Sequence, residues 1–175
     1  SKDRTAKIAT DGRYTTQIAE EVPDITATIG RKTAVELLSQ VSVGHRVGFE
    51  ADFVSVSELK RLEAECPEGV TLVPVSGVIE EIRLKKEELE LTRLTEAAQL
   101  ATQALEELVE AGDLRAGRSE LEVAADLEYR MRRLGAERPS FDTIVASGPN
   151  ASKPHHQAGE RIIADGDLVT IDYGM

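Results

Sequence analysis

A stripe of regularly spaced apolar side chains in the middle of the chain restricts the fold more than any other feature. Six of them follow one another at steps of three or four residues: Leu91, Leu94, Ala98, Ala101, Leu105 and Leu108. This spacing places all six on one side of a long helix, and that side must be covered. A coiled coil would cover it. Alanines beside the stripe and a stop at Gly112 favour close packing on another layer instead.

The residues before this helix alternate between short strand signals and short helix signals. Strands are expected at residues 7–10, 25–29, 46–49 and 70–75, and helices at residues 15–22, 31–40 and 55–65. Repeated units of this kind are typical of an α/β layer domain. The composition changes near residues 78–84, after which Glu, Lys and Leu become frequent. We therefore predict two domains, residues 1–80 and residues 81–175.

The chain beyond the long helix predicts a second helix and two short strands. Ser119 and Glu122 have the spacing of a capping box, which marks a helix start, and Gly135 suits the helix end. Strands are expected at residues 141–147 and 168–172, with a polar loop at residues 150–158 between them. The predicted fold class is α/β (α+β).

Charge and composition exclude several classes of protein. Lys plus Arg is 21 and Asp plus Glu is 32, so the net charge is −11, and a chain this acidic does not coat nucleic-acid phosphates. No stretch approaches the roughly 20 apolar residues of a membrane helix, and no secretory signal is visible. The single cysteine, Cys66, cannot form an internal disulfide, which suits a reducing compartment. We expect a cytoplasmic protein that binds neither nucleic acid nor membrane.

Asp172 ends the apolar run at residues 168–171, which is expected to be a short buried strand. A charged carboxylate is costly to bury without a partner, so this one should be paired, hydrogen-bonded or bound to a metal ion. Two interpretations remain open from the spacing alone. In one, an arginine or the backbone N–H groups of the next turn satisfy Asp172. In the other, Asp172 is a metal ligand.

Two adjacent histidines, His155 and His156, lie in the polar loop, with glycines at positions 148 and 159 on either side. Loops carry catalytic groups more often than cores do. A histidine here could donate to a carbonyl or a developing oxyanion, or transfer a proton. The alternative is a solvated surface pair. One aspartate and two histidines do not complete a metal site, because a divalent ion needs several converging ligands.

Several motifs together resemble one known family. They are residues 10–14 (TDGRY), 80–90 (EEIRLKKEELE), 117–125 (GRSELEVAA), 135–136 (GA), 140–150 (SFDTIVASGPN), 153–156 (KPHH) and 165–174 (DGDLVTIDYG). In this order and spacing they resemble the Xaa-Pro aminopeptidases and prolidases, which are pita-bread metallopeptidases, over nearly the whole chain. The resemblance implies a partial creatinase-like N-terminal domain in residues 1–80. Residues 81–175 would be the first half of a pita-bread catalytic domain.

The resemblance also implies a reaction, the hydrolysis of the peptide bond before proline. Two divalent ions, manganese, cobalt or zinc, would activate a shared water. Asp172 matches the family's first metal-binding aspartate. His155, 17 residues earlier, matches the histidine that hydrogen-bonds the substrate and stabilises the tetrahedral intermediate. His156 matches no family role. The partner would be a peptide with proline at its second position, and a homodimer is expected.

The resemblance is incomplete at the C-terminal side. The family's other ligands, a second Asp, a His and two Glu, come from segments after the strand of Asp172. We therefore expect this chain to be a piece of a longer enzyme and to be inactive alone. Two alternatives remain: a non-catalytic binding or scaffold member of the same fold, and a creatinase-like hydrolase that needs no metal. The aspartate at position 172 counts against both.

Overall fold

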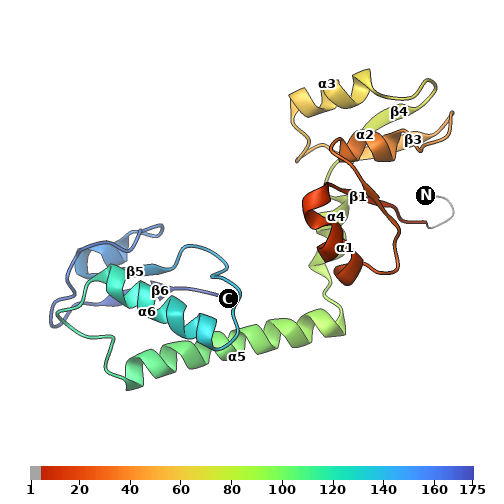
Figure 1. The fold of residues 1–175 in the computed structure, drawn as a ribbon. Coiled ribbons are helices and arrows are strands. Elements are labelled where there is room, and N and C mark those ends of the chain that lie inside the picture. The colour runs from red at the N-terminus through yellow and green to blue at the C-terminus, as the bar shows by residue number, and fades with distance from the viewer. Residues whose placement is uncertain (1–4) are drawn as a thin grey trace. The chain divides into compact units, whose positions relative to one another are not determined.

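The chain divides into two compact units, residues 1–85 and residues 86–175 (Figure 1). The structure, a computed structural model, describes residues 5–175. The first unit contains β1 (Ile8–Thr10), a 3-10 turn (Gly12–Tyr14), α1 (Thr15–Glu21), β2 (Ala27–Ile29), α2 (Thr33–Leu38), β3 (Arg46–Glu50), α3 (Val56–Ala64), β4 (Thr71–Val75) and α4 (Val78–Leu84). The second contains α5 (Glu88–Glu110), α6 (Glu120–Arg133), β5 (Ile144–Ser147), a 3-10 turn (Gly148–Ser152) and β6 (Val169–Asp172).

Two pairs of parallel strands form the sheets of the first unit. Ile8 of β1 lies opposite Ala27 of β2, and Arg46 of β3 lies opposite Thr71 of β4. Parallel strands need a crossover connection, which α1 supplies between β1 and β2 and α3 supplies between β3 and β4. These β-α-β units, together with the antiparallel pair of the second unit, confirm the predicted α/β (α+β) class.

The long helix predicted from the apolar stripe is α5, but only its C-terminal half is covered. Ala104 and Leu108 are buried, whereas Leu91 and Leu94 are 53% and 54% exposed. The covering element is α6, which packs beside α5 (Figure 1). With a rise of about 1.5 Å per residue, the shorter α6 cannot span the whole of α5. Packing on another layer is therefore confirmed for one half of the stripe.

The start of α6 is the predicted capping box. The backbone N–H of Glu122 donates to Oγ of Ser119 (3.1 Å), and Oε2 of Glu122 accepts from the N–H of Ser119 (2.8 Å). The helix ends before Gly135, whose φ of 117° lies in the left-handed region that favours glycine. The buried face of α6 joins the core of the second unit, which contains Ala104, Leu108, Val123, Ala124, Leu127, Met131, Val145 and Ile163.

An antiparallel pair, β5 and β6, completes the second unit. Ile144 lies opposite Asp172, and Ser147 lies opposite Val169. The expectation of a buried final strand at residues 168–172 is wrong. Only alternate residues of β6 turn toward the core, because successive side chains of a strand point to opposite faces. Leu168, just before β6, is 75% exposed. Among the helices of residues 5–175, none is both long enough and apolar enough to cross a bilayer.

Candidate active site

The two residues singled out from the sequence lie at separate places in the second unit. His155 lies in a turn after the 3-10 segment Gly148–Ser152, and Asp172 is the last residue of β6. Both side chains are exposed. Within residues 5–175 no hydrogen bond or ion pair joins them, and neither side chain has another polar partner.

The environment of Asp172 differs from that expected of a buried carboxylate. Val169 and Ile171 are half-buried, whereas Asp172 lies on the opposite face of β6 and is exposed. Water therefore solvates the carboxylate, and no partner is needed to offset burial. Neither an arginine nor a backbone N–H contacts its oxygens in the part of the chain that the structure describes. The oxygens of Asp172 are free to accept a ligand.

The described residues do not by themselves fit a divalent metal ion. No group of three or more His, Cys, Asp or Glu side chains converges anywhere in residues 5–175. Asp172 offers one carboxylate at the end of a paired strand, and divalent ions need several oxygen or nitrogen ligands. This part of the chain can contribute a ligand but cannot hold the ion.

The most buried charged group of the second unit is Glu120, which sequence reasoning missed. It is the first residue of α6, and none of its surface is exposed. Its Oε1 accepts hydrogen bonds from the N–H of Ser147 (2.8 Å), the hydroxyl of Ser147 (2.8 Å) and Nδ2 of Asn150 (3.0 Å). Its Oε2 lies 2.7 Å from Nε2 of His156. Four short contacts thus converge on one buried carboxylate.

These contacts keep Glu120 ionised. Burial alone raises the pKa of a carboxyl group, but the hydrogen bonds from Asn150, His156 and Ser147 outweigh it and lower the pKa of Glu120 to about 2. An ionised carboxylate only accepts hydrogen bonds. Nε2 of His156 therefore carries the hydrogen of its contact with Oε2. The carboxylate also lies at the N-terminus of α6, where the helix dipole favours a negative charge.

The polar contacts of Glu120 continue through Ser147 to a partly buried ion pair, Arg161 and Asp167. The hydroxyl of Ser147 donates to Glu120 and accepts from Nη1 of Arg161 (2.6 Å). The same nitrogen lies 2.7 Å from Oδ2 of Asp167. Hydrogen bonding to Arg161 lowers the pKa of Asp167. One connected network therefore runs from Asp167 through Arg161, Ser147 and Glu120 to His156.

Backbone contacts tie the following segment to the same end of α6. The N–H of Glu120 donates to the carbonyl of Arg161 (3.0 Å), and that of Leu121 donates to the carbonyl of Gly159 (3.0 Å). These two N–H groups are among those that a helix start leaves without helical partners. The loop after His156 therefore serves as part of the cap of α6.

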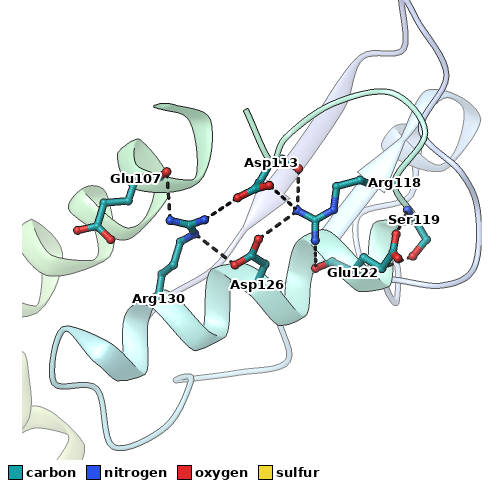
Figure 2. Close-up of polar contacts among 7 residues, drawn as sticks. All are labelled: Glu107, Asp113, Arg118, Ser119, Glu122, Asp126 and Arg130. Atoms are coloured by element: carbon teal, nitrogen blue, oxygen red, sulfur yellow. Dashed lines mark hydrogen bonds and ion pairs between the residues drawn. The ribbon is translucent and has the colours of Figure 1, made fainter. Parts of the chain in front are cut away.

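An alternating series of charged residues fixes the start of α6 against the end of α5, and Figure 2 shows it. We call Asp113, Arg118, Asp126 and Arg130 the Arg–Asp ladder. Arg118 lies 3.1 Å from Asp126, and Arg130 lies 2.7 Å from Asp113 and 3.3 Å from Asp126. Arg130 also donates to the carbonyl of Glu107 in α5 (3.2 Å). The ladder holds the segment that leads into Ser119 and Glu120.

A signal for Glu120 was present in the sequence. The buried apolar residues Val123, Ala124, Leu127 and Met131 follow it by three, four, seven and eleven positions. Glu120 therefore lies on the buried face of the helix that the capping box defines. A carboxylate at such a position requires buried partners. What the sequence could not show is that those partners are Ser147, Asn150 and His156.

Two family models together match almost the whole chain. Residues 1–85 match the creatinase/prolidase N-terminal domain, and residues 92–175 match metallopeptidase family M24. An uncharacterized peptidase of Bacillus subtilis is 36% identical over 99% of this chain and 49% of its own length. A Xaa-Pro dipeptidase of Pyrococcus horikoshii is 42% identical over 57% of this chain and 28% of its own length. The chain thus spans half or less of the length of these relatives.

Solved structures of related proteins share the fold. The Xaa-Pro dipeptidase of Bacillus anthracis matches with a TM-score of 0.84 and 35% identity, over 95% of this chain and 46% of that one. The Xaa-Pro aminopeptidase of Thermotoga maritima matches with a TM-score of 0.83 and 30% identity, over 98% of this chain and 47% of that one.

Proposed function

Because the chain belongs to metallopeptidase family M24, with a creatinase/prolidase N-terminal domain before the M24 segment, we propose that the full-length protein hydrolyses the peptide bond before proline. Its substrate would be a Xaa-Pro dipeptide or a longer peptide with proline at the second position. Relatives named Xaa-Pro dipeptidase support this substrate class. The exposed imidazole of His155, in a loop tied to the buried Glu120, is placed where it can donate to a peptide carbonyl.

In this proposal His155 is the catalytic residue that this chain supplies. Its imidazole is exposed and has no polar partner within residues 5–175, so its N–H is free to donate to the carbonyl oxygen of a bound peptide. Such a donor stabilises the negative charge that develops on that oxygen. The alternative, in which His155 and His156 are a solvated surface pair, does not hold for His156, because its side chain is mostly buried and contacts Glu120.

Asp172 is proposed as one metal ligand of the full-length protein. The family implies divalent metal ions, which would supply an activated water. The remaining ligands would come from residues outside this chain, since the described ones do not converge on a site. We propose manganese, cobalt or zinc as the metal. The domain boundary at residue 80, the homodimer and the cytoplasmic location remain predictions.

The proposal is tested by assaying the full-length protein with a Xaa-Pro dipeptide, with and without a metal chelator. We expect turnover that the chelator abolishes, and a loss of about 100-fold or more in kcat for His155→Ala. His45→Ala is the matched control, because His45 is exposed and lies outside the proposed site.

Other outcomes of this assay would identify the alternatives. Absence of turnover in any metal would favour a non-catalytic binding or scaffold protein. Turnover that persists in chelator would favour a creatinase-like hydrolase. Full activity of His155→Ala would contradict the role given to His155.

A further inference from the structure

The loop that carries His155 is anchored on both sides of that residue to one carboxylate. Asn150, five positions earlier, donates to Oε1 of Glu120, and His156, one position later, lies 2.7 Å from Oε2. Lys153 adds a contact inside the loop, from Nζ to Oδ1 of Asn150 (2.7 Å). The His155 side chain is exposed and makes no polar contact within residues 5–175.

The anchor itself is held firmly in place. Glu120 is fully buried at the first position of α6, behind the capping box of Ser119. The Arg–Asp ladder holds the residues that lead into this helix start, as Figure 2 shows. A group fixed by a packed helix positions its partners more accurately than another loop residue could.

We propose that Glu120 is a positioning residue for His155, acting through His156 and Asn150. The carboxylate fixes the two ends of the short segment from 150 to 156, so that the His155 imidazole meets the substrate in one orientation. This inference rests on the proposed function, in which His155 contacts the peptide. It also gives a role to His156, which no sequence motif explained.

We call the contacts of Glu120 with Asn150 and His156 the tether. Three substitutions distinguish the effect of the tether from that of ordinary packing. Glu120→Gln keeps the size of the side chain and an acceptor for Ser147 and Asn150, but its amide group would direct a donor at the Nε2–H of His156. His156→Leu removes the donor and leaves Oε2 of Glu120 unpaired. His156→Gln restores an N–H donor at the end of a side chain and is the conservative rescue.

The kinetic test uses the full-length protein and a Xaa-Pro dipeptide. Partners that orient a functional group are worth roughly 10- to 100-fold in activity, so we expect Glu120→Gln and His156→Leu to lower kcat by this factor. KM should stay within about threefold, because the substrate's ground-state contacts are retained. His156→Gln should recover kcat to within about fivefold of the wild type.

The same substitution made in a His155→Ala protein distinguishes the positioning of His155 from a general loss of stability. If Glu120 acts only through His155, Glu120→Gln should change kcat by less than about twofold in a protein that already carries His155→Ala, because effects of residues that act as a unit are not additive. An equal loss in both backgrounds would overturn the proposal. So would a wild-type kcat in Glu120→Gln.

A measurement without turnover separates this inference from the proposed function. Hydrogen–deuterium exchange of the full-length protein, followed by mass spectrometry, reports on peptides that span residues 150–158. We expect Glu120→Gln to speed exchange there by about tenfold, and by more than in α5, whose amides report the general loss of stability. If the wild type hydrolyses no Xaa-Pro peptide but exchange rises as expected, the proposed function fails and the tether stands. Unchanged exchange overturns the tether whatever the activity.

Discussion

Glu120 carries a full negative charge inside the second unit, and its stability contribution should depend on pH. Its pKa is lowered from 4.5 to about 2. A lowered pKa in the folded state stabilises the fold above the unfolded value and loses this effect as pH falls through the folded value. The contribution of Glu120 is therefore complete above about pH 4.5 and is lost between there and about pH 2.

Glu120→Gln should consequently be most destabilising near neutral pH. We expect a loss of about 1–3 kcal/mol in the free energy of unfolding at pH 7, measured by urea denaturation, and a smaller difference from the wild type at pH 3. Asp167, which joins the same network through Arg161 and Ser147, also has a lowered pKa, and the charge of Glu120 opposes that lowering. In Glu120→Gln this opposition is removed, so Asp167 offsets a lesser part of the loss. A difference that grows as the pH falls would contradict this account.

Gly148 offers a second prediction at the scale of single residues. Its φ of 50° is strained for any other residue, and an added Cβ would lie 2.6 Å from Nη2 of Arg161 and 2.6 Å from Oδ1 of Asp167. Gly166 also has a positive φ, of 83°, but open space around it. We expect about 1 kcal/mol of destabilisation for Gly166→Ala from backbone strain, and about 2 kcal/mol or more for Gly148→Ala. Equal losses of unfolding free energy for the two variants, measured by urea denaturation, would show that Arg161 and Asp167 can move away from the added methyl group at little cost.

Sequence reasoning gave a role to His155 and Asp172 but none to Glu120, although Glu120 lies inside one of the motifs that carry the resemblance. His155 and Asp172 could be named because their neighbours form recognisable runs. The burial of Asp172 was predicted wrongly, since the apolar run at residues 168–171 hid the alternation that exposes one face of β6. Glu120 was missed because its partners, Ser147 and His156, lie 27 and 36 positions away. Contacts at that separation depend on tertiary packing.

At the scale of elements, local signals were sufficient where a helix begins and ends by itself. The capping box of Ser119 and the glycine at position 135 marked α6 correctly. The stripe on α5 was predicted correctly as a helix but only half correctly as a buried face. The reason is that helical spacing shows which side could be buried, whereas the length of the neighbouring helix decides how much is.

The Arg–Asp ladder should contribute to the packing of α5 against α6. Asp126 lies between Arg118 and Arg130, both of which are mostly buried. Asp126→Asn should lower the free energy of unfolding by about 1–3 kcal/mol, because two largely desolvated guanidinium groups lose a charged acceptor. Glu58→Gln is the matched control, since the Glu58–Arg61 pair is more exposed and worth roughly 0–1 kcal/mol.

Hydrogen exchange of the full-length protein can measure the effect of each substitution on local stability. Asp126 lies in the second unit and Glu58 lies in the first. Protection of α6 should fall in Asp126→Asn, and protection of α3 should change little in Glu58→Gln. Equal, small effects would mean that water already screens the ladder.

At the scale of the whole molecule, the two units match separate family models, and together they span about half of the relative from Bacillus subtilis. We predict that the 175-residue chain alone, given manganese and a Xaa-Pro dipeptide, shows no metal-dependent turnover, because its described residues do not assemble a metal site. The full-length protein assayed under the same conditions is the positive control. Turnover by the short chain would refute both this prediction and the ligand scheme behind it.

The uncovered half of α5 has a consequence for how such a protein is made. Leu91 and Leu94 remain accessible after this part of the chain has folded. Ribosomes add roughly 5–20 amino acids per second, so a polypeptide twice this long would display those leucines for on the order of ten seconds before its remaining half emerges. During that interval we expect the exposed leucines to favour aggregation unless a nascent-chain chaperone binds them.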